Sequence, residues 1–273
     1  MNVIEINTVD APAAAPYARL TEAQLRRAGE GRGLFIAESM NVIKSALEAG
    51  HTPVSLLTER RRLEEISSEL GPLIGETPVL TADEEELAKL TGYRLSRGFL
   101  CAMERKPLLP VEEALKGASR VAVLEGINDP SNVGAIIRSA AALGMDAVLL
   151  AENCCDPLHR RAARVSMGAV FRVPWAALPC KAGNANAVDM SALRENGFFA
   201  AAAALTAGSL AIDDPSILRA EKLAVLLGSE GNGLCPETVA CADSTVMIPM
   251  ARGVDSLNVA AAAAVIFWTV AKK

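Results

Sequence analysis

Three short polar segments, each placed after an apolar stretch, hold the residue types most able to do chemistry. The first runs from Asn128 to Ala140 and contains Asn132 and Arg138, which are six residues, almost two helical turns, apart. On a helix, these two side chains are expected to share roughly one side, with Ser131 or Asn132 capping the N-terminus. A capped helix with one exposed arginine would have the same pattern, so this segment alone assigns no chemistry.

The second segment, 226–234, places Gly228, Glu230, Gly231 and Gly233 directly after an apolar stretch. Glycines at this density let the backbone approach a ligand closely and adopt positive φ. The segment is not a Walker A loop, because no Gly-Lys-Ser/Thr follows, and it lacks the dinucleotide-binding G-x-G-x-x-G pattern. A glutamate among the glycines is unusual for a plain strand-to-helix turn.

The third segment, 248–259, begins with the apolar Ile248 before a proline and ends in Ser256-Leu257-Asn258, which opens an alanine-rich helix. A hydroxyl, an amide and free backbone N–H groups therefore meet at a helix N-terminus, where small polar or charged ligands bind well. A serine or aspartate N-cap on a buried helix would give the same sequence, and the two roles are compatible.

Alternating strands and helices are predicted around these segments, which favours a parallel sheet covered by helices on both faces. Residues 179–187 have the polar, glycine-containing composition of an exposed loop. The predicted strands are 120–124, 147–150, 198–205, 223–227 and 245–248, and the predicted helices are 132–143, 159–167, 192–196, 236–241 and 256–271.

The first part of the chain predicts a separate, smaller α/β domain. Its strands are expected at 34–37, 54–58, 79–80 and 98–103, and its helices at 20–28, 39–49, 60–70 and 82–90. A charge run with two prolines at 104–110 indicates a linker. We therefore expect an N-terminal domain at 1–106, a linker at 107–117 and a C-terminal domain at 118–273.

Composition narrows the class of protein. The chain has 273 residues, a net charge of −5 and 51% hydrophobic but only 4% aromatic residues, so Ala, Leu and Val must build the core. Six cysteines without a C-x-x-C pair and only two histidines argue against zinc, and we expect no metal. The N-terminus lacks signal-peptide features, and the most apolar run, 259–268, is shorter than a membrane span. We expect a cytoplasmic protein without membrane contact.

Together, the three segments resemble the SpoU/TrmH family of SPOUT-class RNA 2′-O-ribose methyltransferases, from Val121 to the C-terminus. Residues 155–157 and 164–169 also look like sequence of this family. The pattern 32–38 resembles the L30e-like substrate-binding domain. The resemblance implies an α/β fold in which a C-terminal SPOUT domain has a parallel sheet, helices on both faces and a deep trefoil knot, beside a smaller N-terminal α/β domain.

The resemblance also implies an activity: S-adenosylmethionine-dependent methyl transfer to a ribose 2′-hydroxyl of RNA, with ribosomal RNA favoured over transfer RNA. Arg138 would act as a base or, as we favour, as an anchor for phosphate and ribose. Asn132 would bond the ribose or hold Arg138, and Glu230 would orient Arg138. The implied catalytic residues are Arg138, Asn132, Glu230, Ser256 and Asn258, and the implied cofactor-binding residues are Leu205, Gly228, Glu230, Gly231, Gly233, Ile248, Met250, Ser256 and Leu257.

RNA binding requires positive charge, which this acidic chain can supply only locally. The candidate contacts are Arg26, Arg32, Arg60, Arg61, Arg62, Arg160, Arg161 and Arg164. The family resemblance implies a homodimer, with which the apolar last helix is compatible. Two alternatives stay open: an RNA-binding protein that keeps the SPOUT fold without turnover, and a Rossmann-type enzyme, which the missing glycine fingerprint disfavours.

Overall fold

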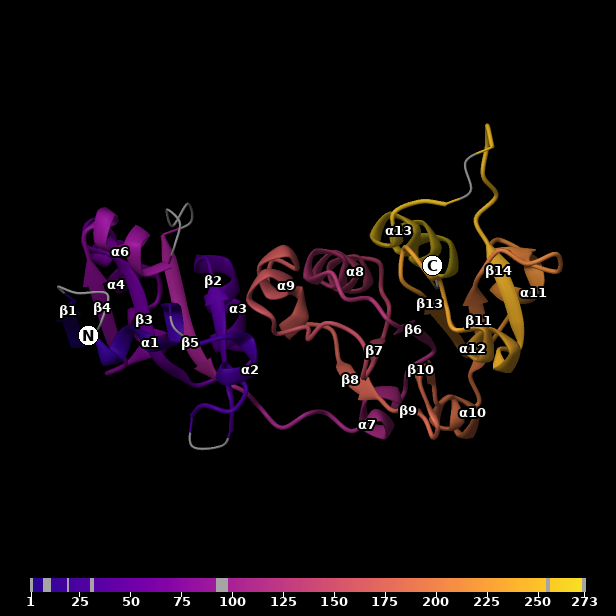
Figure 1. The fold of residues 1–273 in the computed structure, drawn as a ribbon, viewed down its shortest axis with the longest axis horizontal. Helices are drawn as coiled ribbons and strands as arrows, with labels where there is room; N and C mark the ends of the chain where they lie inside the picture. Colours follow the sequence, from indigo (N-terminus) through magenta and orange to yellow (C-terminus); the bar gives the residue numbers. More distant parts are fainter. Residues whose placement is uncertain are drawn as a thin grey trace. The chain divides into compact units, whose positions relative to one another are not determined.

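The computed structural model describes residues 2–6, 11–18, 20–29, 32–91, 98–253 and 256–271. The chain divides into two compact units (Figure 1), and the first comprises Met1–Pro107 together with Leu158–Phe171. The second unit comprises Leu108–Pro157 and Arg172–Lys273. The change of unit at 107/108 lies close to the expected end of the N-terminal domain at 106. Segment 158–171, however, belongs to the first unit although it lies within the expected C-terminal domain.

The first unit is built on a five-stranded mixed sheet. Its strand order is β1 (Asn2–Glu5), β4 (Pro78–Ala82), β3 (Pro53–Glu59), β5 (Phe99–Glu104) and β2 (Leu34–Glu38). Strand β5 runs antiparallel to both of its neighbours, whereas β1, β3 and β4 are parallel. The four predicted strands are present, but β1 was not predicted because all of its side chains are exposed and its sequence lacks alternation.

Short helices surround this sheet. Helix α2 begins with a capping box in which Thr21 Oγ1 accepts from Gln24 N at 3.3 Å and Gln24 Oε1 accepts from Thr21 N at 2.8 Å. In chain order the helices of this unit are η1 (Pro12–Ala14), α1 (Ala15–Ala18), α2 (Glu22–Leu25), α3 (Met40–Glu48), η2 (Arg60–Arg62), α4 (Leu63–Glu69), α5 (Gly71–Ile74), α6 (Glu84–Thr91), α9 (Arg160–Val165) and η3 (Ala169–Phe171). The four predicted helices correspond to α2, α3, η2 with α4, and α6, and the other helices of this unit were not predicted within it.

A buried carboxylate explains why α9 and η3 belong to the first unit. Glu38, at the end of β2, is 2% exposed and accepts from Arg160 Nε and Arg164 Nη1, each at 3.0 Å. The ring of Phe171 packs against Phe35 and His51, with centroid separations of 5.8 and 5.2 Å. Ion pairs and ring packing thus fix this segment on β2.

The second unit contains a seven-stranded, fully parallel sheet. Its order is β12 (Leu210–Ala211), β14 (Ser244–Met247), β11 (Phe199–Ala203), β13 (Leu223–Leu227), β6 (Arg120–Leu124), β7 (Ala147–Ala151) and β8 (Trp175–Leu178). The helices are α7 (Val111–Leu115), α8 (Pro130–Ala142), α10 (Ser191–Glu195), α11 (Pro215–Leu218), α12 (Pro236–Cys241) and α13 (Val259–Val270).

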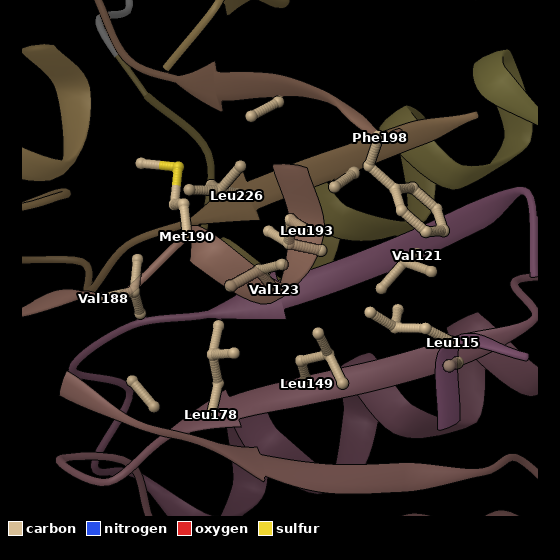
Figure 2. Packing of buried hydrophobic residues seen from close by; sticks show 14 of the residues in the cluster. Leu115, Val121, Val123, Leu149, Leu178, Val188, Met190, Leu193, Phe198 and Leu226 are labelled. Atoms are coloured by element: carbon tan, nitrogen blue, oxygen red, sulfur yellow. The ribbon is translucent and has the colours of Figure 1, made fainter. Parts of the chain in front are cut away.

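The central strands are largely apolar, and their side chains are buried on both faces of the sheet, as expected for parallel strands. On one face, Val121 and Val123 of β6 meet Leu149, Leu226 and Phe198 (Figure 2). The intervening β6 residues are equally buried and must face the opposite layer, because successive side chains alternate across a strand. This double burial accounts for the low polarity of the central strands.

Two local features of the second unit differ from expectation. The predicted linker 107–117 contains α7, whose Ala114 and Leu115 are buried in the core. The predicted exposed loop 179–187 is mostly exposed, but it forms an antiparallel hairpin of β9 (Cys180–Lys181) and β10 (Asn184–Val188), which β8 precedes. Residues 184–187 do alternate between Asn and Ala, but both residue types are depleted in strands, so the composition did not identify a strand. None of the helices in the described ranges has the length and apolar character required to cross a membrane.

Candidate active site

The second unit brings the three polar segments to the carboxyl ends of its parallel strands. Strands β6 and β13 are neighbours, but their next connections lead in opposite directions, to β7 and to β14. Ligands in α/β sheets bind beyond the strand ends at such a reversal. The segment after β6 leads into α8. The segment after β13, residues 228–233, is called the glycine loop. Both segments therefore flank this position.

The glycine loop is closed on itself by its backbone. Gly233 N donates to Ser229 O at 2.9 Å, and Ser229 N donates back to Gly233 O at 3.2 Å. A Cβ on Gly228 would lie 2.2 Å from the carbonyl carbon of Gly233, so only glycine fits there. Glu230 lies exposed in the short turn between these hydrogen bonds. The glycines therefore shape the turn that presents this carboxylate.

A buried glutamate that the sequence analysis missed holds the far end of the loop. Glu125 follows β6, is 2% exposed, and accepts from Cys235 N at 2.5 Å and Val188 N at 3.1 Å. The hydroxyl of Thr238 also donates to this carboxylate. The partners lie 63 to 113 residues away in sequence, so no local pattern identifies Glu125. Its carboxylate joins the loop exit, α12 and the β9–β10 hairpin.

Asn258 connects the third segment to the other two. Its Oδ1 accepts from Ala260 N at 3.0 Å and Ala261 N at 3.3 Å, so Asn258 is the N-cap of α13. Its Nδ2 donates to Asn132 Oδ1 at 3.1 Å and also to the carboxylate of Glu230. The expected serine or aspartate cap was wrong for the described Ser256, because α13 begins at 259, and Asp255 lies outside the described residues.

Arg138 is exposed on α8, in the same helix as Asn132. Six residues correspond to about 1.7 turns, so the two side chains leave the helix about 120° apart and do not share one side as expected. No side-chain hydrogen bond or ion pair joins Arg138 to another residue in the described ranges. The expected bond from Glu230 to Arg138 is not formed, because Glu230 receives the amide of Asn258 instead.

Helix α8 also starts earlier than expected. Asp129, rather than Ser131 or Asn132, is its N-cap: Asp129 Oδ1 accepts from Ser131 N at 2.7 Å, and Pro130 occupies the first helical position. Asn132 therefore lies within the first turn, and its side chain is available for Asn258. Helix α8 packs against α13, which keeps the two asparagines together.

Apolar side chains lie exposed around the same strand ends. Leu205 follows β11 and is 62% exposed, and Leu257 precedes α13 and is 41% exposed. Ile248 and Met250, after the neighbouring strand β14, are half-buried. The hydroxyl of Thr206, in the loop after β11, lies 2.9 Å from the hydroxyl of Thr245 within β14. The expected cofactor residues thus border one edge that combines apolar surface with backbone loops.

The candidate RNA-binding arginines belong to the first unit and differ in their pairing. Arg32 pairs with Glu104 at 3.0 Å, and each arginine of η2 contacts at least one acid. Arg160 and Arg164 share Glu38, whereas Arg161 is exposed. Among the described residues, no cluster of histidine, cysteine and acidic side chains could hold a metal ion.

Comparison with known proteins gives one consistent result. A tRNA/rRNA methyltransferase of Mycobacterium tuberculosis, itself uncharacterised, is 41% identical over 241 residues, which span 87% of this chain and 81% of that protein. The structure superposes on an AdoMet-bound rRNA methyltransferase from Sinorhizobium meliloti with a TM-score of 0.81, at 24% identity, covering 98% of this chain and 97% of the other.

A second solved structure, the SpoU methyltransferase AviRb from Streptomyces viridochromogenes in complex with AdoMet, gives a TM-score of 0.73 at 22% identity, covering 95% of this chain and 97% of that chain. These two structural likenesses establish the α/β fold of SPOUT methyltransferases. The SpoU rRNA Methylase family model matches residues 119–268, the region that contains all three polar segments. The chain therefore belongs to the SpoU rRNA methylase family of RNA methyltransferases.

Proposed function

We propose that this chain transfers a methyl group from S-adenosylmethionine to a ribose 2′-hydroxyl of RNA, with ribosomal RNA favoured over transfer RNA. The observation that carries the proposal is the contact of Asn258 with both Asn132 and Glu230, beside a helix that presents Arg138. Three segments far apart in sequence thereby bring amide and carboxylate groups into contact, and the helix that carries Asn132 presents Arg138 on another side. Family membership supports the methyl-transfer class.

The residues at this edge suit S-adenosylmethionine. Leu205 and Leu257 expose apolar surface that an adenine ring would cover, and pockets for such ligands are mostly apolar with a few placed polar groups. The glycine loop lies at the same edge. Its backbone can fold tightly there because Gly228 packs directly against the backbone of Gly233. Bound there, the cofactor would supply an electrophilic methyl group on a positively charged sulfur.

Arg138 would position the nucleophile. Its guanidinium stays protonated in proteins, so it donates hydrogen bonds and is a poor base. Bonds from Arg138 to a phosphate and a ribose oxygen would align the 2′-hydroxyl, and such alignment can lower a barrier by about 7–11 kcal/mol. Arg138 would thus orient the hydroxyl oxygen towards the methyl group that the cofactor supplies, and a phosphate oxygen would take the hydroxyl proton.

The polar cluster would keep the site in this arrangement. Asn258 holds Glu230 and Asn132 in fixed positions, which leaves Arg138 available for RNA. We further propose that segments 228–233 and 248–258 form the knotted loops of the family, with Ser256 lining the pocket. The exposed Val265 and Trp268 on α13 support, as an additional proposal, a homodimer through this helix.

Methyl transfer can be tested directly on RNA. Purified protein is incubated with methyl-labelled S-adenosylmethionine and protein-free 16S, 23S or transfer RNA, and the RNA is digested with alkali. Because a 2′-O-methyl group blocks cleavage at the adjacent phosphodiester, label is expected in alkali-resistant dinucleotides, mostly from ribosomal RNA. Label on a base would contradict the ribose assignment, and RNA binding without label would favour the non-catalytic alternative.

A further inference from the structure

Two basic segments that are far apart in sequence lie side by side in the first unit. Glu22, the first residue of α2, accepts from Arg160 N at 3.2 Å, and its Oε1 lies 3.8 Å from His159 Nε2. This contact places the start of α2 against the start of α9. In sequence, the two helices are separated by more than 130 residues.

Each helix brings arginines to this junction. Arg26 N donates to Glu22 O at 3.0 Å, so Arg26 stands one helical turn after the glutamate that touches α9, and Arg27 follows it. Helix α9 carries Arg160, Arg161 and Arg164. We define the α2–α9 surface by these five arginines and by the two glutamates that contact them, Glu22 and Glu38.

The acids around this surface do not neutralise it. Glu38 pairs with Arg160 and Arg164. Neither Arg27 nor Arg161 has an acid within ion-pair distance in the described ranges. The three arginines of η2 show the opposite balance, because Glu5, Glu59, Glu65, Asp83 and Glu84 lie within ion-pair distance, a net charge of −2. The longer run of consecutive arginines is therefore the less positive site.

Two arginines of the α2–α9 surface are exposed and available for a partner. Within the described ranges, neither Arg27 nor Arg161 has a side-chain hydrogen bond or an ion pair. The surface under them is held in place, because buried Glu38 bonds Arg160 and Arg164 and so fixes α9 on β2. Exposed cations beside a helix that is fixed in this way suit a polyanion whose charges are regularly spaced.

We propose that RNA docks on the α2–α9 surface through its backbone phosphates, and that the η2 arginines do not take part. This inference rests on the proposed function, since it concerns the same RNA. Phosphate contacts fix the register and orientation of a nucleic acid without reading its sequence. The surface would thus hold the RNA while the second unit acts on the ribose.

The test compares two double charge reversals. Arg27→Glu with Arg161→Glu removes the exposed cations of the surface, and Arg60→Glu with Arg61→Glu is the matched control. Arg61 bonds the buried Glu59, so Arg60→Glu alone replaces the control if the double variant does not fold. Arg160 and Arg164 are left intact, because their loss would leave Glu38 buried without its partners. Filter binding of protein-free 16S and 23S ribosomal RNA is measured from low to moderate salt, and circular dichroism verifies folding.

The first variant is expected to raise the Kd by at least about 10-fold and to reduce the slope of log K against log salt by about 1.4–1.8, the value for two lost phosphate contacts. The control should stay within about 3-fold of the wild-type Kd, since its arginines are already paired. Arg27→Gln with Arg161→Gln should give a smaller loss in the same direction, which keeps the test valid if charge reversal disturbs folding.

Equal effects of the two charge reversals, or a larger effect of the η2 pair, would overturn the docking surface. Unchanged RNA affinity in both variants would overturn it as well, while label transfer by the wild-type protein would leave the proposed function intact. Failure of the wild-type protein to bind or methylate any of these RNAs would instead remove the proposed function and this inference together. The two failures are therefore distinguishable.

Discussion

The amide of Asn258 donates to Asn132 Oδ1 over 3.1 Å, a contact between residues 126 positions apart. The same amide reaches the carboxylate of Glu230, so one side chain joins the N-termini of α8 and α13 to the glycine loop. Asn258 also caps α13 with its other atom, Oδ1. Fold stability and site geometry therefore depend on two different atoms of one residue, which permits them to be separated by mutation.

Asn258→Ser tests that separation. A serine hydroxyl can still cap α13, so the free energy of unfolding should change by only a few tenths of a kcal/mol. The amide donor to Glu230 and Asn132 is lost, so these two groups are no longer held in place, and methyl transfer should fall about 10- to 100-fold, or about 1.4–2.7 kcal/mol in the barrier. Asn258→Ala should in addition cost about 1 kcal/mol of stability. Equal activity of the serine variant and the wild type would show that the contact is only structural.

The glycine loop offers a pair of matched substitutions. Gly228→Ala places a Cβ against the backbone of Gly233 and should displace the loop, whereas Gly231→Ala meets no atom within 4 Å. We expect Gly228→Ala to weaken S-adenosylmethionine binding by at least about 10-fold in calorimetry, since bulk added at a packed site typically costs about 1–3 kcal/mol. Gly231→Ala should bind within about 3-fold of wild type. Similar affinities for both variants would remove the loop from the cofactor site.

Glu125→Ala tests the buried anchor behind this loop. The substitution leaves Cys235 N, Val188 N and the Thr238 hydroxyl without their acceptor. Each unsatisfied buried donor costs about 1–3 kcal/mol, so urea unfolding should show a loss of about 3 kcal/mol or more. The control is Glu237→Gln on α12, where Glu237 forms an exposed ion pair with Lys181 of β9 and a clearly smaller loss is expected. A loss at Glu125 no larger than the control would argue against the anchor.

The first unit should lose stability in mild acid through His51. Burial lowers the pKa of His51 below its usual 6.5, and nearby Lys106 and Arg105 act in the same direction. The unfolded chain therefore binds this proton at a higher pH than the folded chain, so stability is present above about pH 6.5 and falls as the pH drops below it. Urea unfolding at pH 7.5 and 5.5 should show a larger decrease for wild type than for His51→Gln. The same decrease in both proteins would exclude His51 as the cause.

Much of the second unit could be predicted from local sequence. Strands β6 and β13 lie at their predicted bounds, because short apolar runs buried on both faces have a distinct pattern. The three polar segments could likewise be located, since each follows such a strand. Asn132, Glu230 and Asn258 were all identified as site residues, and the structure brings them into contact.

Long-range polar contacts could not be predicted in this way. Glu125 looks like any residue after a strand, and its role depends on Thr238, which is 113 positions away. Glu38 pairs with arginines more than 120 residues away, so nothing local indicated that α9 belongs to the first unit. At the start of α13, Ser256 and Asn258 are both good capping residues, and only the helix geometry decides between them.

Substitution of Arg138 tests the central claim most directly. Methyl transfer to ribosomal RNA is measured for wild type, Arg138→Ala and Arg138→Lys, with S-adenosylmethionine affinity and thermal unfolding measured on the same preparations. Because Arg138 is exposed and has no partner in the described ranges, stability should change by less than about 0.5 kcal/mol and cofactor affinity should be unchanged. Ribose methylation by Arg138→Ala should fall about 100- to 1,000-fold, the loss expected for one essential donor. Wild-type rates of ribose methylation in Arg138→Ala would contradict the account.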